Sequence, residues 1–597
     1  MRRLFILVLL FSTPLFSQED FFFQEDALAQ EYFKNGDFKK ALNEYQKLYD
    51  NAPNNINYIN QIIAAYQQLE LYNEAETFLL SLMKKIKYPA FMVELGYNHQ
   101  LKNEVKKATA YYMKAIESVD ENVNNSFSVA RTFQSHSLLN QAISTYEKAM
   151  LLNPELNFNW QLAQIYGEQG DIEKMFNSYI SFVETTPDAL NTIKRAINDF
   201  ISEDSTQENN VLFRKILLKK SQKDQNLIWN ELLSWLFIQQ KEYNKSFIQE
   251  KAIFNRQPES LNRIEELANM AVLEDEIEVA KAIFGFLIDT AQDLDTKIAA
   301  HYNLLKIETE ESTVKDFKAL GLKYQDFFKT FGKFSATLKA QIGYAHFLAF
   351  KMNASQKAIS YLQDTLELPL SEMQKAEVKM ALGDVLVLEE KFNEALIYYT
   401  QIQRNLKNST ISQEARFKVA KTSYFKGDFK WAESQLNILK ASTSQLIAND
   451  ALELKLLISD NKYEDSLQTA LKLYAKADLL GFQNRKDDAI SVLDQLLSAH
   501  QTEPIVEQAL FKQAQLFEDN KQFKRAEDNY NNLLLSYRDG ILADNACYAL
   551  AELYAHELEQ PEKAKMLYGQ IVFDYPDSIY FVDARKKYRG LRGDAIK

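Results

Sequence analysis

The residue types that most often perform catalysis or hold metals are few and widely separated in this sequence. No H-E-x-x-H pair, paired-histidine spacing or cysteine cluster supplies the ligand arrangement of a metal site. No G-x-S-x-G or P-loop pattern occurs, so neither an activated serine nor a phosphate-binding loop is indicated. We therefore expect no catalytic residues, no metal and no cofactor. The six histidines, scattered one to a helix or turn, are His99, His136, His301, His346, His500 and His556.

The other groups that could react have ordinary structural interpretations. The single cysteine, Cys547, lies in D-N-A-C-Y-A-L-A-E-L-Y among core-type residues, where a buried, small apolar side chain is expected rather than a reactive thiol. Carboxylates occur in runs such as E-T-E-E-S and V-L-E-E-K, and on amphipathic helices such runs usually face solvent. The sequence thus predicts a protein that binds, not an enzyme.

Length and composition indicate an all-α protein with more than one core. The chain has 597 residues, whereas single cores usually stop growing near ~250–300 residues. It contains only 15 Gly and 10 Pro, although these types average about 7% and 5% of ordinary proteins. With so few turn-forming residues, a β-rich or loop-rich fold is disfavoured, and helices must position any binding residues.

The pattern of residues at the N-terminus predicts an export signal. Met1-Arg2-Arg3 is basic, and residues 4–16 (LFILVLLFSTPLF) form an apolar core of 13 residues, shorter than the ~20 that a spanning helix needs. Cleavage after Ser17 would leave a mature chain, and no cysteine near this boundary could accept a lipid. We therefore expect a periplasmic protein without a transmembrane segment, with peripheral association with the outer membrane left open.

The net charge of the chain disfavours some classes of binding partner. A formal net charge of −13 without basic blocks argues against nucleic acid or an anionic membrane as the main partner. The local exception is the basic stretch from Arg585 to Arg592. We interpret it as a solvated last helix, with a docking patch as the alternative.

A repeat runs through the chain and identifies its architecture. Near the start, E-Y-F-K-N-G-D-F-K-K-A (31–41) nearly matches T-S-Y-F-K-G-D-F-K-W-A (422–432). The small residue after each such turn serves as an anchor, and the first five anchors are spaced by 34, 33, 34 and 33 residues. In the second half the stride is longer: Ala358, Ala395 and Ala432 are spaced by 37 residues, and Ala526 and Ala564 by 38. The anchors are Ala41, Ala75, Ala108, Ala142, Met175, Ser246, Ala280, Ala358, Ala395, Ala432, Ala489, Ala526 and Ala564.

This period and its order of small and aromatic residues resemble the tetratricopeptide repeat, a helix–turn–helix unit of ~34 residues. Small residues allow two helices to approach closely, and aromatics fill the space beside them. One pair cannot bury its apolar stripe alone, so neighbouring pairs must stack. The resemblance therefore implies an all-α, right-handed superhelix of about a dozen helix pairs.

The register divides the chain into four segments. They are a signal peptide (1–17), an N-terminal repeat array (18–188), an irregular helical middle (189–337) and a C-terminal array with longer repeats and a basic tail (338–597). We expect bends near 190–225 and 300–335. The longer units, closing with D-Y-P-D-S-I-Y-F-V-D-A-R (574–585), resemble those of periplasmic tetratricopeptide proteins of outer-membrane assembly and the Tol–Pal region. The chain as a whole resembles exported tetratricopeptide proteins of Bacteroidetes type.

The resemblance also implies where a partner would bind. In this family the first helix of each unit forms the concave wall through positions 2, 5, 9, 12 and 13, with the anchor counted as 20. Few of these positions are basic here, so a carboxylate clamp is disfavoured, and an extended or helical peptide fits better. The candidate partner-binding residues are Gln67, Tyr97, Phe127, Arg131 and Trp160 in the first half, and Phe417, Lys421, Tyr424, Phe425 and Phe511 in the second.

The two copies of the repeated phrase differ in the place of an aromatic. Aligning Ala29 with Ala420 matches Tyr32 to Ser423, so Tyr424 and Phe425 fall at positions 12 and 13. We expect this pair to turn toward the concave wall, where clustered aromatics are common interface anchors. Packing against a neighbouring helix of a tightly wound superhelix is the alternative.

Together these features predict a non-enzymatic periplasmic scaffold or adaptor for other envelope proteins, in outer-membrane protein assembly or secretion. The alternatives are a regulator of cell-wall enzymes and a glycan- or peptidoglycan-binding module. SusD-like glycan-binding lipoproteins are disfavoured, because the chain lacks a lipidated cysteine and long Gly/Pro/Trp-rich loops. A glycan site would need an aromatic platform ringed by carboxylates and amides, whereas a scaffold would show a long apolar groove or separated patches. The oligomeric state stays open.

Overall fold

The computed structural model describes residues 18–439, 444–461 and 468–594, so the predicted signal peptide, residues 1–17, lies outside the described residues. All regular elements within these ranges are helices, and the predicted all-α solenoid of helix pairs is confirmed. The chain divides into two compact units, with Val279 the last residue of the first and Ala280 the first residue of the second. Helix α16 (Ile277–Thr290) contains this boundary.

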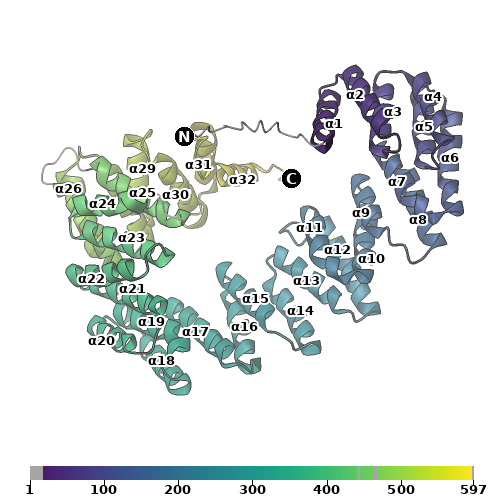
Figure 1. Cartoon of the computed structure of the whole chain (residues 1–597). Helices are drawn as coiled ribbons and strands as arrows, with labels where there is room; N and C mark the ends of the chain where they lie inside the picture. Colours follow the sequence, from purple (N-terminus) through teal and green to yellow (C-terminus); the bar gives the residue numbers. More distant parts are fainter. Residues whose placement is uncertain (1–17, 440–443, 462–467, 595–597) are drawn as a thin grey trace, which may run out of the picture. The chain divides into compact units, whose positions relative to one another are not determined.

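In the first unit, successive helices pack side by side (Figure 1). The helices are α1 (Gln18–Lys34), α2 (Phe38–Asn51), α3 (Ile56–Gln68), α4 (Tyr72–Met83), α5 (Ala90–Leu101), α6 (Val105–Glu121), α7 (Ser126–Ser135), α8 (Leu139–Leu152), α9 (Asn159–Glu168), α10 (Ile172–Thr185), α11 (Leu190–Ile197), α12 (Glu208–Lys223), α13 (Leu227–Gln239), α14 (Tyr243–Arg256) and α15 (Asn262–Leu273).

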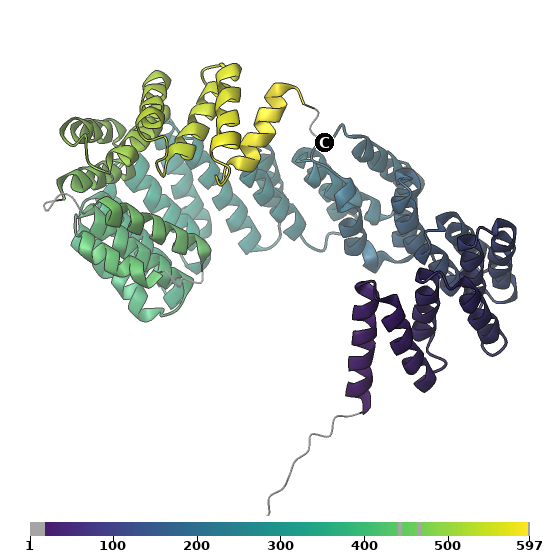
Figure 2. The same ribbon diagram turned by 90° about the horizontal axis from the view of Figure 1, so that it is seen from above.

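The second unit is built in the same way (Figure 2). Its helices are α17 (Leu294–Glu311), α18 (Phe317–Phe331), α19 (Leu338–His346), α20 (Ser355–Leu366), α21 (Glu372–Leu388), α22 (Phe392–Asn405), α23 (Thr410–Phe425), α24 (Phe429–Leu439), α25 (Gln445–Asn461), α26 (Thr469–Phe482), α27 (Lys486–Ala499), α28 (Val506–Asp519), α29 (Phe523–Ser536), α30 (Ala543–His556), α31 (Pro561–Asp574) and α32 (Phe581–Arg592). A short π-helical stretch (Phe347–Lys351) continues α19.

The turn inside each repeat has one conformation throughout the described chain. In every unit the residue five places before the anchor has a left-handed backbone, with φ between 49° and 83°. In the repeated phrase this residue is Gly36 or Gly427. The backbone N–H of the following residue donates to the carbonyl five or six residues earlier, as Asp428 N does to Ser423 O at 2.9 Å. The thirteen residues are Gly36, Glu70, Asn103, Ser137, Gly170, Lys241, Asp275, Asn353, Glu390, Gly427, Asn484, Lys521 and Glu559.

The anchors explain why each turn must reverse the chain so tightly. All thirteen anchors are buried, including Met175 and Ser246, because the second helix of each pair presses this position against the first. The Ser246 hydroxyl remains satisfied by Ser234 Oγ at 2.9 Å. These pairs leave α11, α12, α17, α18, α25 and α32 outside the repeat register. Four of the six fall where the bends were expected, and the bends themselves stay a prediction.

We expect Lys521→Gly to raise the free energy of unfolding of the second unit by about 0.5–1 kcal/mol. The left-handed backbone costs an L-residue about 1–2 kcal/mol, and the greater freedom of glycine in the unfolded chain offsets part of this gain. Lys521 is an exposed residue with a φ of 56°. Urea unfolding followed by circular dichroism measures the change. At the equivalent position of another repeat, the opposite kind of substitution, Gly427→Ala, should lower stability by about 1 kcal/mol. Equal effects of both variants would contradict a left-handed turn shared by the two repeats.

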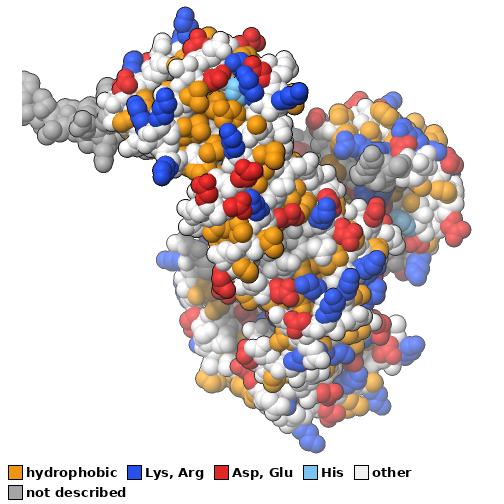
Figure 3. Space-filling model, turned by 90° about the vertical axis from the view of Figure 1, so that its right-hand side faces the viewer, with side chains coloured by type: hydrophobic (Ala, Val, Ile, Leu, Met, Phe, Trp, Pro, Cys, Tyr) orange, Lys and Arg blue, Asp and Glu red, His pale blue; other side chains and the backbone are white. Residues whose placement is uncertain are grey.

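One face of the molecule is drawn in space-filling form in Figure 3, and it mixes charges of both signs. On the face drawn in Figure 3, Lys and Arg side chains are interspersed with Asp and Glu side chains rather than gathered by sign. None of the described helices combines the length and apolar character that crossing a bilayer requires. In the basic C-terminal stretch, Lys587 pairs with Glu552 at 2.7 Å and with Asp583 at 3.0 Å, so intramolecular contacts already neutralise part of its charge.

Candidate functional site

Three of the five candidate partner-binding residues in the first unit are buried or pack against neighbouring aromatic rings. Gln67 is buried, with 7% of its surface exposed. Tyr97 stacks on His136 with 3.8 Å between ring centroids. Trp160 packs edge-on against Tyr179 at 5.3 Å and belongs to the margin of the first unit's core. These side chains support the solenoid itself.

The other two candidates of the first unit form a small exposed pair on α7. Phe127 is 43% exposed, and the Arg131 guanidinium lies 6.0 Å from the centre of its ring. Arg131 is also exposed. A single aromatic with one cation offers limited area for a partner, so the first unit does not gather its candidates into one site.

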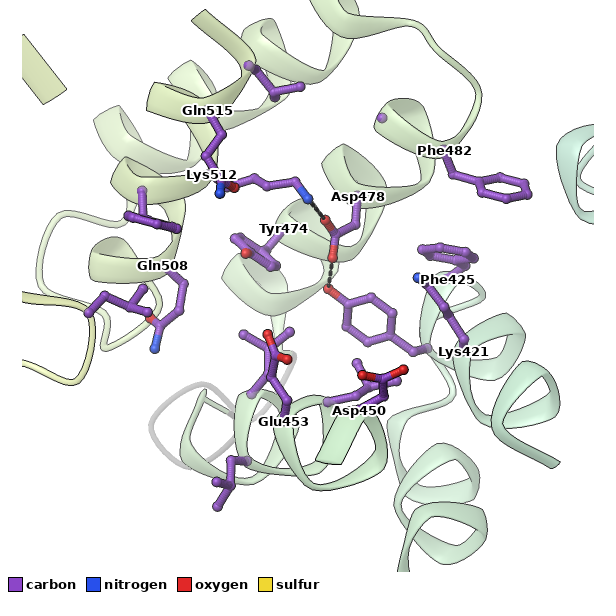
Figure 4. Close-up of a pocket in the computed structure, with 18 of the residues that line it drawn as sticks. Lys421, Phe425, Asp450, Glu453, Tyr474, Asp478, Phe482, Gln508, Lys512 and Gln515 are labelled. Carbon is purple, nitrogen blue, oxygen red and sulfur yellow. Dashed lines mark hydrogen bonds and ion pairs between the residues drawn. The ribbon is translucent and has the colours of Figure 1, made fainter. Parts of the chain in front are cut away.

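The five candidates of the second unit do gather. Phe417, Lys421, Tyr424, Phe425 and Phe511 all line one cavity of about 790 Å³. Figure 4 shows this cavity between α23, α25, α26 and α28. We call it the α25 cavity, because helix α25 supplies one of its walls and lies outside the repeat register. The wall residues of α25 are Asp450, Glu453, Leu454, Leu456, Leu457 and Asp460.

The repeat register explains which residues form the wall of the α25 cavity opposite helix α25. Counting from anchor Ala489, positions 5, 9 and 13 of α26 are Tyr474, Asp478 and Phe482, and all three line the cavity. Counting from Ala526, Phe511 and Gln515 take positions 5 and 9 of α28. Of these residues, only Phe511 is among the candidates predicted from the sequence. Counting from anchor Ala489 identifies the wall residues of α26 in the same way.

Tyr424 corrects the prediction of an exposed aromatic pair. Its ring lines the base of the cavity wall but is 0% exposed, and it belongs to the core of the second unit. Its hydroxyl donates to Asp478 Oδ2 at 3.1 Å. Burial raises the pKa of Tyr424 well above its ordinary value, and the nearby Asp478 carboxylate adds to this shift. Phe425 is half-buried, so of the shifted pair only Phe425 can offer surface to a partner.

Ion pairs within the wall fix several charged side chains. Lys512 Nζ lies 2.9 Å from Asp478, which therefore accepts from both Lys512 and Tyr424 (Figure 4). Lys486 pairs with Asp519 at 2.9 Å. Lys421 is exposed to the cavity, yet the surrounding protein displaces water from its amine and lowers its pKa. The cavity thus combines a fixed polar network with the Lys421 amine, which has no ion-pair partner within the described part of the chain.

Apolar side chains cover the remaining wall. Leu454 and Leu457 of α25 are half-buried, and Leu456 is 46% exposed. Ile541, ahead of α30, is 68% exposed at the rim. Aliphatic groups on one side and phenyl rings on the other make a surface that an apolar protein segment can cover.

A second, smaller cavity adjoins the first along the same row of helices. It has a volume of about 360 Å³ and is lined by His346, Phe350 and Asp384, among others. The Phe350 ring lies 5.6 Å from Phe482, and Phe482 lies 6.1 Å from Phe425. Three phenyl rings therefore form a continuous ridge between the two cavities. Burial lowers the pKa of His346, which favours its neutral form.

The described residues contain no group of three or more His, Cys, Asp or Glu side chains that could hold a metal ion. Cys547 is buried, and burial raises the pKa of its thiol to about 12, so the thiolate is strongly disfavoured. This agrees with the structural role expected for it.

Two segments of the chain match a model of the tetratricopeptide repeat, residues 27–55 and 474–546. The chain contains tetratricopeptide repeats. The second match includes α26 and α28, so the Tyr474, Asp478 and Phe511 side chains that line the α25 cavity stand on helices of confirmed tetratricopeptide units.

Comparison with solved structures gives weaker likenesses. One is a chain of the Naa15/Naa10 complex bound to HypK-THB, with 11% identity, 96% of this chain and 94% of that chain covered, and a TM-score of 0.29. Another is a chain of the APC/C hetero-tetramer Cut9–Hcn1, with 13% identity, 96% of each chain covered, and a TM-score of 0.23. At these TM-scores neither likeness carries an argument. Among curated proteins, none matches this sequence.

Proposed function

We propose that this protein is a non-enzymatic scaffold that binds a segment of another protein in the α25 cavity. The observation that carries the proposal is the convergence of aromatic side chains from three repeat units on one cavity. Phe417, Phe425, Phe482 and Phe511 come from α23, α26 and α28, and all four line it. Partly exposed aromatics grouped in a concavity are the usual anchors of protein interfaces.

The chemistry of the walls favours an apolar protein segment over a sugar. The cavity does contain carboxylates and amides, as a glycan site would, including Asp450, Glu453 and Gln515. However, its α25 wall also carries Leu454, Leu456 and Leu457, which cannot hydrogen-bond the hydroxyl groups of a sugar. Leucine and phenyl side chains instead match the apolar face of a helix or an extended peptide.

Peptide selection tests the proposal directly. The purified chain is used to select from a displayed library of random peptides, and the enriched peptides are synthesised and titrated. We expect the dissociation constant to rise at least tenfold in Phe511→Ser, because one of the aromatic rings that line the cavity is lost. The matched control is Trp431→Ser, which removes a 51% exposed aromatic of α24 that does not line the cavity.

The outcomes separate the two kinds of ligand. Equal losses in both variants, or no enriched peptide, would contradict binding in the α25 cavity. Retention of the chain on peptidoglycan or oligosaccharides, abolished by Phe511→Ser, would instead favour the glycan-binding alternative and count against the scaffold.

We further propose that the protein works in the periplasm, with partners in outer-membrane protein assembly or secretion. This part of the proposal is supported by the sequence of residues 1–17 and by the longer repeats of the second half. Cell fractionation with N-terminal sequencing tests it. We expect a periplasmic chain that begins at Gln18, whereas a cytoplasmic chain that retains Met1 would rule out export.

A further inference from the structure

Three lysines lie on the repeat wall at and beside the α25 cavity, and two of them have carboxylate partners. Lys418 Nζ lies 3.0 Å from Asp384, and Lys512 Nζ lies 2.9 Å from Asp478. Each pair joins the first helix of one unit to the first helix of a neighbouring unit. Lys421, on α23 between them, has no carboxylate within ion-pair distance among the described residues, and its amine lies 5.9 Å from the centroid of the Phe425 ring.

Among the described residues, the neighbouring acids lie too far from the Lys421 amine to form an ion pair with it. Asp478 already accepts from the Tyr424 hydroxyl and from Lys512. Asp450 and Glu453 stand on the opposite wall, on α25, where they are exposed to water (Figure 4). The cavity walls remove part of the hydration of the Lys421 amine and lower its pKa, and the positive charges of Lys418 and Lys512 lower it further, while the carboxylates of Asp478 and Asp450 offset only part of this cost. An anion arriving at this amine would therefore relieve an unfavourable charge.

We propose that the segment bound in the α25 cavity carries one acidic side chain that pairs with Lys421, between apolar side chains that contact Phe417 and Phe511. This inference rests on the proposed function of the same cavity. It adds the charge that the partner must carry and makes Lys421 a specificity-determining residue.

The surroundings favour an acidic side chain within the segment over a C-terminal carboxylate. Beyond Lys421 the row of rings Phe425, Phe482 and Phe350 leads into the second cavity. A bound segment can therefore continue past Lys421 instead of ending there. The carboxylates of Asp450 and Glu453 repel additional negative charge, so a segment with several acids would bind less well than one with a single acid.

Blocked peptides test the inference with the full chain. The probes are acetyl-Leu-Phe-Glu-Phe-Leu-amide and its counterparts with Gln or Lys in the central place, which differ only in side-chain charge. A fourth peptide, with the central Gln and a free C-terminus, tests a terminal carboxylate. Binding is measured by titration calorimetry or by NMR shifts, for the unaltered chain, for Lys421→Gln and for the control Lys430→Gln, which changes an exposed lysine of α24 that does not line the cavity.

We expect the Glu peptide to bind about tenfold more tightly than the Gln peptide. This preference should fall to within about twofold in Lys421→Gln and persist in Lys430→Gln. Tightest binding of the Lys peptide, a Glu preference that survives Lys421→Gln, or tighter binding of the free C-terminal peptide would overturn the inference. Equal binding of all probes that is lost in Phe511→Ser would leave the proposed function standing while refuting the role of Lys421. No binding of any probe would overturn both.

Discussion

Replacing Tyr424 with alanine should lower the free energy of unfolding of the second unit by about 4 kcal/mol. The ring is 0% exposed and packs against Phe429, with 5.8 Å between the ring centroids. Removing a buried aromatic typically costs about 3–5 kcal/mol, because its contacts are lost and a cavity remains. Asp478 also loses the hydroxyl that donates to it at 3.1 Å. Urea unfolding of the chain, followed by circular dichroism, measures the change.

Two further variants separate packing from hydrogen bonding. Tyr424→Phe keeps the ring and removes the hydroxyl, so it should cost about 1 kcal/mol. Phe417→Ala truncates a half-buried ring on the cavity wall and should cost less than Tyr424→Ala while weakening peptide binding. If Tyr424→Ala lost less than about 1 kcal/mol, the tyrosine would not be the core residue that its burial indicates.

Gly383→Ala should destabilise the second unit by about 2 kcal/mol, although alanine is the better helix former. A Cβ at Gly383 would lie 2.5 Å from Cζ of Tyr399, well inside contact distance. The tyrosine has little room to retreat, because its ring is 0% exposed and its hydroxyl donates to Asp384 at 2.6 Å. Overpacking of this kind costs about 1–3 kcal/mol. The change in urea midpoint, at an unchanged slope, gives the value.

Gly481→Ala provides the control for the same chemical change. Gly481 lies in α26, and a Cβ there meets nothing within 4 Å. Because only the helical preference then acts, we expect stabilisation by up to about 1 kcal/mol. The two substitutions should therefore have opposite signs. Destabilisation by both would show that a lost glycine backbone, and not the Tyr399 contact, sets the effect.

Much of the architecture could be predicted from the sequence because each repeat carries its own local signals. The anchors were assigned from the turn that precedes each of them and from their spacing, and all thirteen are buried five residues after a left-handed turn. A helix pair needs a small residue where its backbones approach and a reversal just before it, so the pattern recurs even where the turn residue is Lys521 or Glu390. Periodicity was therefore sufficient for the fold class and for most helix pairs.

The candidate site was predicted only in part. Register placed Phe417, Lys421, Phe425 and Phe511 on one wall, and all four line the α25 cavity. The same register made Tyr424 an exposed wall residue, yet its ring is buried. The position of a residue in a repeat predicts the direction in which its side chain leaves the helix. Whether that side chain is then buried depends on how the chain between anchors Ala432 and Ala489 packs against it. No local pattern records that packing.

The sequence by itself determined the all-α class, the tetratricopeptide units, the anchors and the scarcity of residues for catalysis or metal binding. Only the tertiary structure decided that the first unit's candidates lie dispersed while those of the second unit meet in one cavity. It also decided that Lys418 and Lys512 have carboxylate partners and that Lys421 faces the cavity with none among the residues that the structure describes. The physical reason is distance along the chain. Helix pairs form from contacts between near neighbours in sequence, whereas the cavity requires α23, α25, α26 and α28 to pack together.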